Sequence, residues 1–181
     1  MKETLELKKL LEEDIPQVLA IEHECFATPW SENSFQQELN HNPAAFYFAL
    51  KKADKLLGYG GMWVVEDEAH ITNMAVSSAC RKKGLGELIF TNLLSFALGK
   101  NVKWVTLEVR VGNNPAILLY QKFGFVQTGK RPDYYALGED ALILWAGNLQ
   151  GEIFQERLLK LKSQWEKKHP EWEFNLKLGY N

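Results

Sequence analysis

The chain has 181 residues, 46% of them apolar and 24% charged, which is the composition of one soluble globular protein with a sizeable core. Its formal net charge is −2, so no overall basic charge points to nucleic acid or an anionic membrane. No stretch approaches the roughly 20 apolar residues that span a bilayer, and the charged N-terminus lacks the apolar core of a secretory signal. The two cysteines and four histidines show no metal-ligand spacing. We therefore expect a cytoplasmic protein with reduced thiols, no metal, and neither nucleic acid nor membrane as a direct partner.

The first part of the chain predicts a short strand and two helices. Leu5–Leu7 has the pattern of a strand. Asp14, with Gln17 three residues later, predicts a capping box at the start of a helix. Ser31 is expected to cap a second helix that runs through Leu39.

The middle of the chain predicts a βαβ unit that follows two strands. Apolar runs at 46–50 and 56–65 indicate these strands, and glycines within the second predict a bulge or a close neighbour. A strand at 69–76, a helix of period 3.6 from Gly84 and a strand at 103–110 come next. The two strands of such a unit run parallel.

The remainder predicts another helix at 114–123 and strands at 125–130 and 141–146. The expected fold class is α/β, with a mixed sheet and helices on both faces. We divide the chain into a domain at 1–149 and an amphipathic helical extension at 150–181.

The loop Arg81–Gly86 joins the first strand of the βαβ unit to its helix. Backbone N–H groups at a helix start are unpaired, and the helix dipole and cationic side chains add positive charge there. Glycine lets a ligand approach the backbone closely. The loop lacks the Gly-Lys-Ser/Thr triplet of a P-loop and the third glycine of the dinucleotide fingerprint. It therefore predicts a phosphate site of another kind, and a basic helix cap is the open alternative.

Glu108 is the first candidate for chemistry. Strand alternation places Val105, Leu107 and Val109 on one face and Glu108 on the other. Both faces of a parallel strand are normally covered, so burial is expected to raise the pKa of Glu108 and suit it to general-base work. A structural ion pair, with Arg110 or a lysine, is the alternative.

Tyr120 and Asn113 lie just beyond the carboxyl end of the same strand, where open α/β sheets bind ligands. The Tyr120 phenol could donate a proton to a leaving group, or it could be an ordinary core tyrosine. Asn113 could cap the helix or contact an amide of a ligand. His70, on the neighbouring strand, is an alternative base.

Several segments occur together in one order and resemble a known family. Beside the Arg81-x-x-Gly84-x-Gly86 loop they are Cys25-Phe26-x-Thr28-Pro29-Trp30-Ser31, Asn73-Met74-Ala75-Val76, Leu107-Glu108-Val109-Arg110-x-x-Asn113, Leu119-Tyr120-x-x-x-Gly124-Phe125 and Arg131-x-x-Tyr134-Tyr135 with Glu139-Asp140-Ala141. Over residues 4–147 the chain resembles the Gcn5-related N-acetyltransferases (GNAT), most of all the RimI-type ribosomal protein alanine N-acetyltransferases.

The resemblance implies a sheet splayed between strands 69–76 and 103–110, with acetyl-CoA in the gap. Glu108 matches the general base of the family and Tyr120 its general acid. Trp30, Tyr134 and Tyr135 border the implied peptide groove. The implied acetyl-CoA-binding residues are Met74, Ala75, Val76, Arg81, Lys82, Lys83, Gly84, Leu85, Gly86, Glu87 and Asn113.

The resemblance also implies a reaction, which is acetylation of the α-amine of an N-terminal alanine on a small-subunit ribosomal protein of the S18 type. An α-amine has a pKa near 8, roughly two units below that of lysine, so a modest base can free it. A broader protein N-terminal acetyltransferase and a non-catalytic acyl-CoA-binding module are the alternatives, and binding alone would need neither Glu108 nor Tyr120. We expect a monomer or a weak dimer whose partner is the N-terminal peptide of a ribosomal protein.

Overall fold

The structure is a computed structural model and describes residues 2–177. The strands are β1 (Glu3–Lys9), β2 (Ala45–Lys52), β3 (Lys55–Val65), β4 (Glu68–Val76), β5 (Trp104–Arg110), β6 (Val126–Ala136), β7 (Glu139–Ala146) and β8 (Trp172–Lys177). The helices are α1 (Ile15–Cys25), α2 (Glu32–His41), α3 (Leu85–Gly99), α4 (Asn114–Lys122) and α5 (Glu152–Lys168). Within this range the strands form one 8-stranded mixed sheet in the order β6-β7-β5-β4-β3-β2-β1-β8. The predicted α/β fold class is confirmed.

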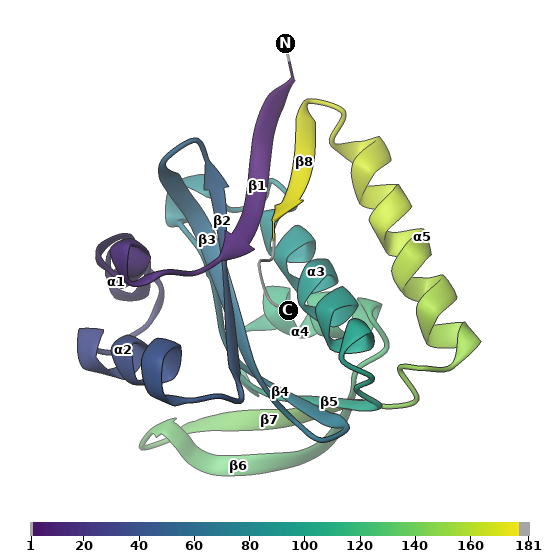
Figure 1. Ribbon diagram of the computed structural model, residues 1–181. Helices are drawn as coiled ribbons and strands as arrows, with labels where there is room; N and C mark the ends of the chain where they lie inside the picture. Colours follow the sequence, from purple (N-terminus) through teal and green to yellow (C-terminus); the bar gives the residue numbers. More distant parts are fainter. Residues whose placement is uncertain (1, 178–181) are drawn as a thin grey trace.

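Helices cover both faces of the sheet, as Figure 1 shows for α1 and α2 on one side and α3 and α5 on the other. The larger apolar cluster lies beneath α3, α4 and α5, and the smaller one beneath α1 and α2. A Cβ on Gly60 of β3 would lie 2.8 Å from Ile89 Cγ2 and 2.9 Å from Leu93 Cδ1. The predicted close neighbour of this strand is therefore α3, which packs directly on the backbone of β3.

The sheet opens between β4 and β5. These strands pair in parallel only from Glu68–Trp104 to Ile71–Leu107. The register of β4 against β3 shifts at this point and leaves Thr72 without an opposite residue. Such a bulge bends a strand, and beyond it β4 continues to Val76 with β3 as its one strand partner among residues 2–177. The predicted splayed sheet is confirmed.

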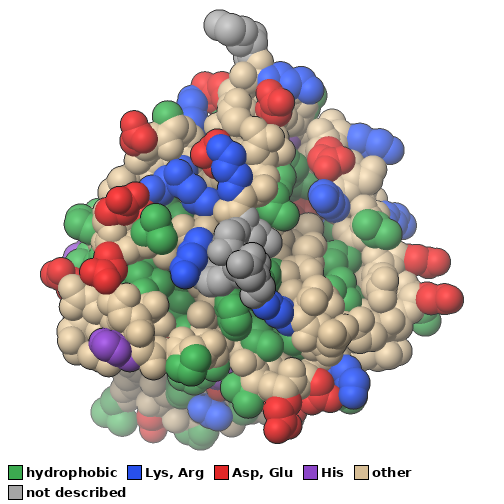
Figure 2. Space-filling view, viewed as in Figure 1, with side chains coloured by type: hydrophobic (Ala, Val, Ile, Leu, Met, Phe, Trp, Pro, Cys, Tyr) green, Lys and Arg blue, Asp and Glu red, His purple; other side chains and the backbone are tan. Residues whose placement is uncertain are grey.

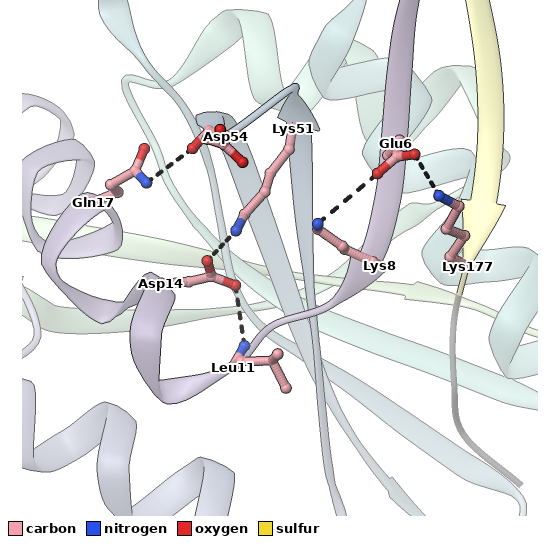
Figure 3. Close-up of polar contacts among 8 residues, drawn as sticks. All are labelled: Glu6, Lys8, Leu11, Asp14, Gln17, Lys51, Asp54 and Lys177. Carbon is pink, nitrogen blue, oxygen red and sulfur yellow. Dashed lines mark hydrogen bonds and ion pairs between the residues drawn. The ribbon is translucent and has the colours of Figure 1, made fainter.

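The predicted capping box at Asp14 is wrong. The Asp14 carboxylate accepts a hydrogen bond from the Leu11 backbone N–H at 3.2 Å and forms a buried ion pair with Lys51 of β2 (Figure 3). Gln17 instead donates to the Asp54 carbonyl at 3.1 Å. A buried charge needs a partner of opposite charge, and here that partner comes from a distant strand that local sequence reasoning does not consider.

The C-terminal extension contains a strand as well as a helix. The buried side chains of α5 join the larger cluster and are Phe154, Leu158, Leu161 and Trp165. Beyond α5, β8 pairs in parallel with β1, and Lys177 donates to Glu6 of β1 at 2.5 Å (Figure 3). The sequence predicts the helix but not β8, a short edge strand that exposes most of its side chains.

The surface shows no strong charge segregation on the face drawn in Figure 2, where acidic and basic side chains are interspersed. Within the described part of the chain, no helix is long and apolar enough to cross a membrane. Over the same residues, no group of three or more His, Cys, Asp or Glu side chains is arranged to hold a metal ion.

Candidate active site

Glu108 lies at the opening of the sheet, on the face of β5 opposite the buried Val105, Leu107 and Val109. Its side chain is only 7% exposed. One carboxylate oxygen lies 2.6 Å from Nε2 of His70 on β4, and the other lies 3.3 Å from Nη1 of Arg131 on β6. The carboxylate therefore lies between His70 of β4 on one side and Arg131 of β6 on the other.

The expected rise in the pKa of Glu108 is wrong. The hydrogen bond from His70 lowers the pKa of this carboxyl below its ordinary value, and it outweighs the opposing effect of burial, with the Arg131 charge acting in the same direction as His70. The expected partner Arg110 binds Glu139 instead, at 3.1 Å. Glu108 is thus an ionised carboxylate at neutral pH, able to attract a cation, and its lowered pKa makes it a weaker proton acceptor than the sequence predicts.

The tyrosines predicted to border the peptide groove lie beside this carboxylate. The Tyr135 hydroxyl donates to the backbone carbonyl of Glu108 at 3.3 Å. The Tyr134 and Tyr135 rings meet edge to face at 5.0 Å, and the Arg131 guanidinium lies over Tyr134 at 5.5 Å. The structure brings them there because β6 runs on to Ala136, beyond the predicted end of this strand. We call Glu108, His70, Arg131 and Tyr135 the carboxylate cluster.

Sequence reasoning missed how this cluster is assembled. His70 and Glu108 lie on neighbouring parallel strands, and combined alternation of both strands could have placed them on one face. The sequence indicates His70 only as an alternative base, whereas in the structure it contacts Glu108. Arg131 reaches Glu108 from a hairpin that pairs with the far side of β5, and no local signal in the sequence indicates this contact.

A second polar group lies under α1 and α2. Glu22 is buried and accepts hydrogen bonds from the Tyr59 hydroxyl and, at 2.7 Å, from the Trp30 backbone N–H. Burial raises the pKa of Glu22, and these bonds, together with Asn73, offset part of that rise. The Oδ1 atom of Asn73 is buried and has no hydrogen-bond partner among the described residues. The Trp30 ring packs on Phe35 at 5.5 Å, and within residues 2–177 it makes no hydrogen bond or ring contact with the carboxylate cluster.

The loop between β4 and α3 presents a row of unpaired donors. From Lys82 to Glu87, no backbone N–H donates a hydrogen bond to any described residue. Lys82 and Gly84 adopt positive φ values of 62° and 72°, and buried Leu85 anchors the first turn of α3 in the core. Convergent N–H groups at a helix N-terminus form an anion-binding arrangement. We call residues 82–87 the glycine loop.

The side chains around the glycine loop have varied partners. Arg81 places Nη2 2.9 Å from Cys25 Sγ and Nε 3.4 Å from the Val76 carbonyl, so its guanidinium lies against the end of β4. Glu87 forms an ion pair with Lys122 of α4. Lys82 and Lys83 are exposed and form no ion pair within residues 2–177. A Cβ on Gly86 would meet nothing closer than Val76 Cγ2, at 3.9 Å, so the fold itself does not require glycine there.

The end of β4 and the start of α4 complete the surroundings of the opening. Met74, Ala75 and Val76 lie on the stretch of β4 that β5 does not pair with. Asn113 caps α4, since its side-chain oxygen accepts from the Ala116 N–H at 3.3 Å. This confirms the cap, and the side-chain NH₂ of Asn113 stays available to a ligand.

Tyr120 is buried in α4, with its ring 5.0 Å from that of Phe90 and 6.2 Å from that of Phe125. Burial raises the pKa of its phenol above the ordinary value, and the neighbouring Tyr135 adds to this effect. Tyr120 therefore keeps its proton at all physiological pH values, as a proton donor must before it acts. The ring contacts also agree with the alternative reading of a core tyrosine.

Comparison with known proteins gives this site a context. The sequence model of the acetyltransferase (GNAT) family matches residues 15–125. A protein of Bacillus subtilis (strain 168), named provisionally as a ribosomal protein bS18-alanine N-acetyltransferase, is 42% identical over 146 residues, which cover 80% of this chain and 97% of that protein. The ribosomal protein bS18-alanine N-acetyltransferase of Escherichia coli (strain K12) is 34% identical over 134 residues, or 72% of this chain and 89% of that enzyme.

Solved structures agree with the sequence relatives. The crystal structure of the ribosomal-protein-S18-alanine N-acetyltransferase from Escherichia coli has a TM-score of 0.74 at 31% identity and covers 80% of this chain and 94% of that one. Ard1 from Thermoplasma volcanium has a TM-score of 0.72 at 25% identity over 79% of this chain and 97% of that one. These matches confirm the resemblance seen in the motifs. The chain belongs to the acetyltransferase (GNAT) family.

Proposed function

We propose that this acetyltransferase transfers the acetyl group of acetyl-CoA to the α-amine of an N-terminal alanine on a ribosomal protein of the S18 type, in the cytoplasm. Relatives with that name at 42% and 34% identity support the substrate. The observation that carries the chemistry is the buried, ionised Glu108 carboxylate, which lies 2.6 Å from His70 at the opening of the sheet.

The glycine loop suits the pyrophosphate of acetyl-CoA, which enzymes of this family use. Its unpaired N–H groups, the dipole of α3 and the exposed Lys82 and Lys83 all favour an anion. The free edge of β4 at Met74–Val76 and the NH₂ of Asn113 offer hydrogen-bonding groups to the amide-bearing arm. When bound, acetyl-CoA supplies an acetyl group activated as a thioester.

Glu108 attracts and deprotonates the amine in this proposal. The α-ammonium group has a pKa near 8, so a fraction on the order of one tenth is already neutral at pH 7. The negative charge of Glu108 holds the ammonium form in place, and its oxygen accepts the proton directly or through one water. His70, 2.6 Å from that oxygen, keeps the carboxylate oriented and ionised.

Tyr120 is proposed to donate a proton to the thiolate that leaves when the acetyl group is transferred. A departing thiolate has a pKa of about 8.5, so a neutral phenol is a plausible proton donor to it. Because burial keeps the phenol protonated, Tyr120 holds this proton ready in the last turn of α4.

The peptide is proposed to lie between the Tyr134–Tyr135 pair and the polar group under α1. Tyr134 is 44% exposed and offers an aromatic surface next to Glu108. The polar group under α1 provides Trp30 and the Oδ1 atom of Asn73 on the opposite side. This buried oxygen has no hydrogen-bond partner among residues 2–177, so it favours a ligand that donates a hydrogen bond to it. This arrangement would bring the first residue of the peptide to the carboxylate cluster.

A panel of peptides tests the proposal. One peptide starts with alanine in an S18-like sequence, others replace the alanine with serine or methionine, and a matched peptide has a blocked α-amine and an internal lysine. Mass spectrometry should locate the acetyl group on the α-amine of the alanine peptide. Equal rates for all free N-termini would support the broader N-terminal acetyltransferase instead, and preference for lysine would overturn the α-amine assignment. Acetyl-CoA binding without turnover of any peptide would favour the non-catalytic module.

A further inference from the structure

Helix α5 contacts the glycine loop and the C-terminal end of α4. Near its first turns, Arg157 Nη1 lies 3.5 Å from the Phe123 carbonyl at the end of α4. Near its last turn, Trp165 Nε1 donates to the Gly84 carbonyl in the glycine loop at 2.8 Å. One helix of the C-terminal extension therefore bridges the loop before α3 and the end of α4.

The contact at Gly84 leaves the donors of the loop free. Trp165 binds the carbonyl of Gly84, and none of the N–H groups from Lys82 to Glu87 is used by a described residue. The His169 ring packs against that of Trp165 in a tilted arrangement, with 4.8 Å between the ring centres. A Cβ on Gly84 would lie 2.5 Å from His169 Nε2 and 2.7 Å from Trp165 Nε1, so both rings cover this residue.

The chain after α5 fixes these two rings from the other side. The Trp172 backbone N–H donates to the His169 carbonyl at 3.1 Å. β8 then pairs with β1 from Glu3–Trp172 to Lys8–Lys177. The Trp165–His169 turn is thus held between the larger core cluster and an edge strand of the sheet.

The matches to the relatives leave about a fifth of this chain uncovered. The match to the Bacillus subtilis relative covers 97% of that protein but only 80% of this chain. The match to the Escherichia coli structure covers 94% of that chain and again 80% of this one. About a fifth of this chain is left over, which is the size of the segment after residue 147. The contact with Gly84 comes from that segment.

We propose that Trp165, supported by His169, is a positioning residue for acetyl-CoA. By holding the Gly84 carbonyl, it keeps the loop at the positive φ that leaves its N–H groups unpaired. A loop that is ordered in advance loses less conformational entropy when its ligand binds, which strengthens binding without any new ligand contact. The proposal rests on the proposed function, because acetyl-CoA is the ligand.

The substitution Trp165→Phe keeps an aromatic ring and removes the N–H donor. Loss of one neutral hydrogen bond predicts that the Kd for acetyl-CoA, measured by calorimetry, weakens about fivefold. The kcat at saturating acetyl-CoA and the KM for peptide should stay at wild-type values, since the carboxylate cluster is untouched. The matched control is Trp172→Phe in the same extension, because Nε1 of Trp172 has no hydrogen-bond partner among residues 2–177. Its Kd should equal that of the wild type.

An unchanged Kd in Trp165→Phe, or an equal loss in Trp172→Phe, would overturn the positioning role. If Trp165→Phe does not fold, His169→Ala decides, because this side chain is 20% exposed and lies outside the core. It should weaken the Kd about twofold, since Trp165 keeps its hydrogen bond but loses the ring that packs against it, and a wild-type Kd would overturn the proposal. Failure of the wild-type protein to bind acetyl-CoA would remove the proposed function as well, whereas normal wild-type binding with unaffected variants removes the positioning role alone.

Discussion

The glycine loop and the carboxylate cluster are built in opposite ways. The loop offers backbone N–H groups from consecutive residues, and its shape depends on positive φ at Lys82 and Gly84. The cluster joins side chains from β4, β5 and β6, and its charge state depends on the contact between His70 and Glu108. A backbone site can thus be recognised from a short motif, whereas a side-chain site needs the pairing of distant strands. The two regions should also separate in function, with the loop setting acetyl-CoA affinity and the cluster setting the rate of transfer.

The largest effect is expected for Glu108→Gln, which removes the proton acceptor and keeps the shape of the side chain. We expect kcat to fall on the order of 10²-fold or more in steady-state assays with the alanine peptide. Glu139→Gln is the matched control, because Glu139 also forms an ion pair, with Arg110, but is not part of the cluster. An unchanged kcat in Glu108→Gln would remove this residue from the mechanism.

Gly86→Ala probes the loop without disturbing the fold, because the nearest atom to the new Cβ is 3.9 Å away. If the backbone approaches acetyl-CoA closely, the added methyl group should weaken its Kd roughly tenfold in a calorimetric titration. Gly99→Ala in the same helix is the control, since nothing lies within 4 Å of its Cβ position. Wild-type affinity in Gly86→Ala would show that no ligand lies close to this residue.

Tyr120→Phe separates the two readings of the buried tyrosine. As a proton donor to a good leaving group, the phenol should contribute roughly tenfold to the single-turnover rate. As a core residue it would contribute to stability alone, so an unchanged rate with a lowered melting temperature would favour that alternative.

The smallest predicted effect is a shift in one titration. The His70 hydrogen bond lowers the pKa of Glu108, so a carboxyl carbon NMR titration should place its midpoint below the ordinary value of 4.5. The stability that this group contributes is present above its unfolded pKa and is lost as pH falls through the folded pKa. In His70→Gln the midpoint of the Glu108 titration should rise, because burial raises the pKa of Glu108 and the opposing effect of His70 is lost. A wild-type midpoint above 4.5 would show that burial dominates.

Much of the fold follows from local patterns. The βαβ unit, the helix cap at Ser31 and the face of β5 that carries Glu108 were all available from periodicity and capping signals, and the structure confirms them. The splayed sheet came from the resemblance and depends on an unpaired Thr72 that no local pattern indicates.

The misses share one physical cause, which is contact between distant segments. Lys51 takes Asp14 away from its expected cap, and His70 reverses the expected pKa shift of Glu108. β8 forms because β1 leaves an edge free, although its own residues are mostly exposed. Each case depends on a partner that appears only when the sheet is assembled.

The separation of binding from chemistry is tested most directly by titrating acetyl-CoA into Glu108→Gln by calorimetry. The account predicts a Kd within about threefold of the wild-type value, because a group that acts in the transfer step changes the rate and not ground-state binding. A Kd weakened as much as kcat would contradict it, since Glu108 would then act through the acetyl-CoA site.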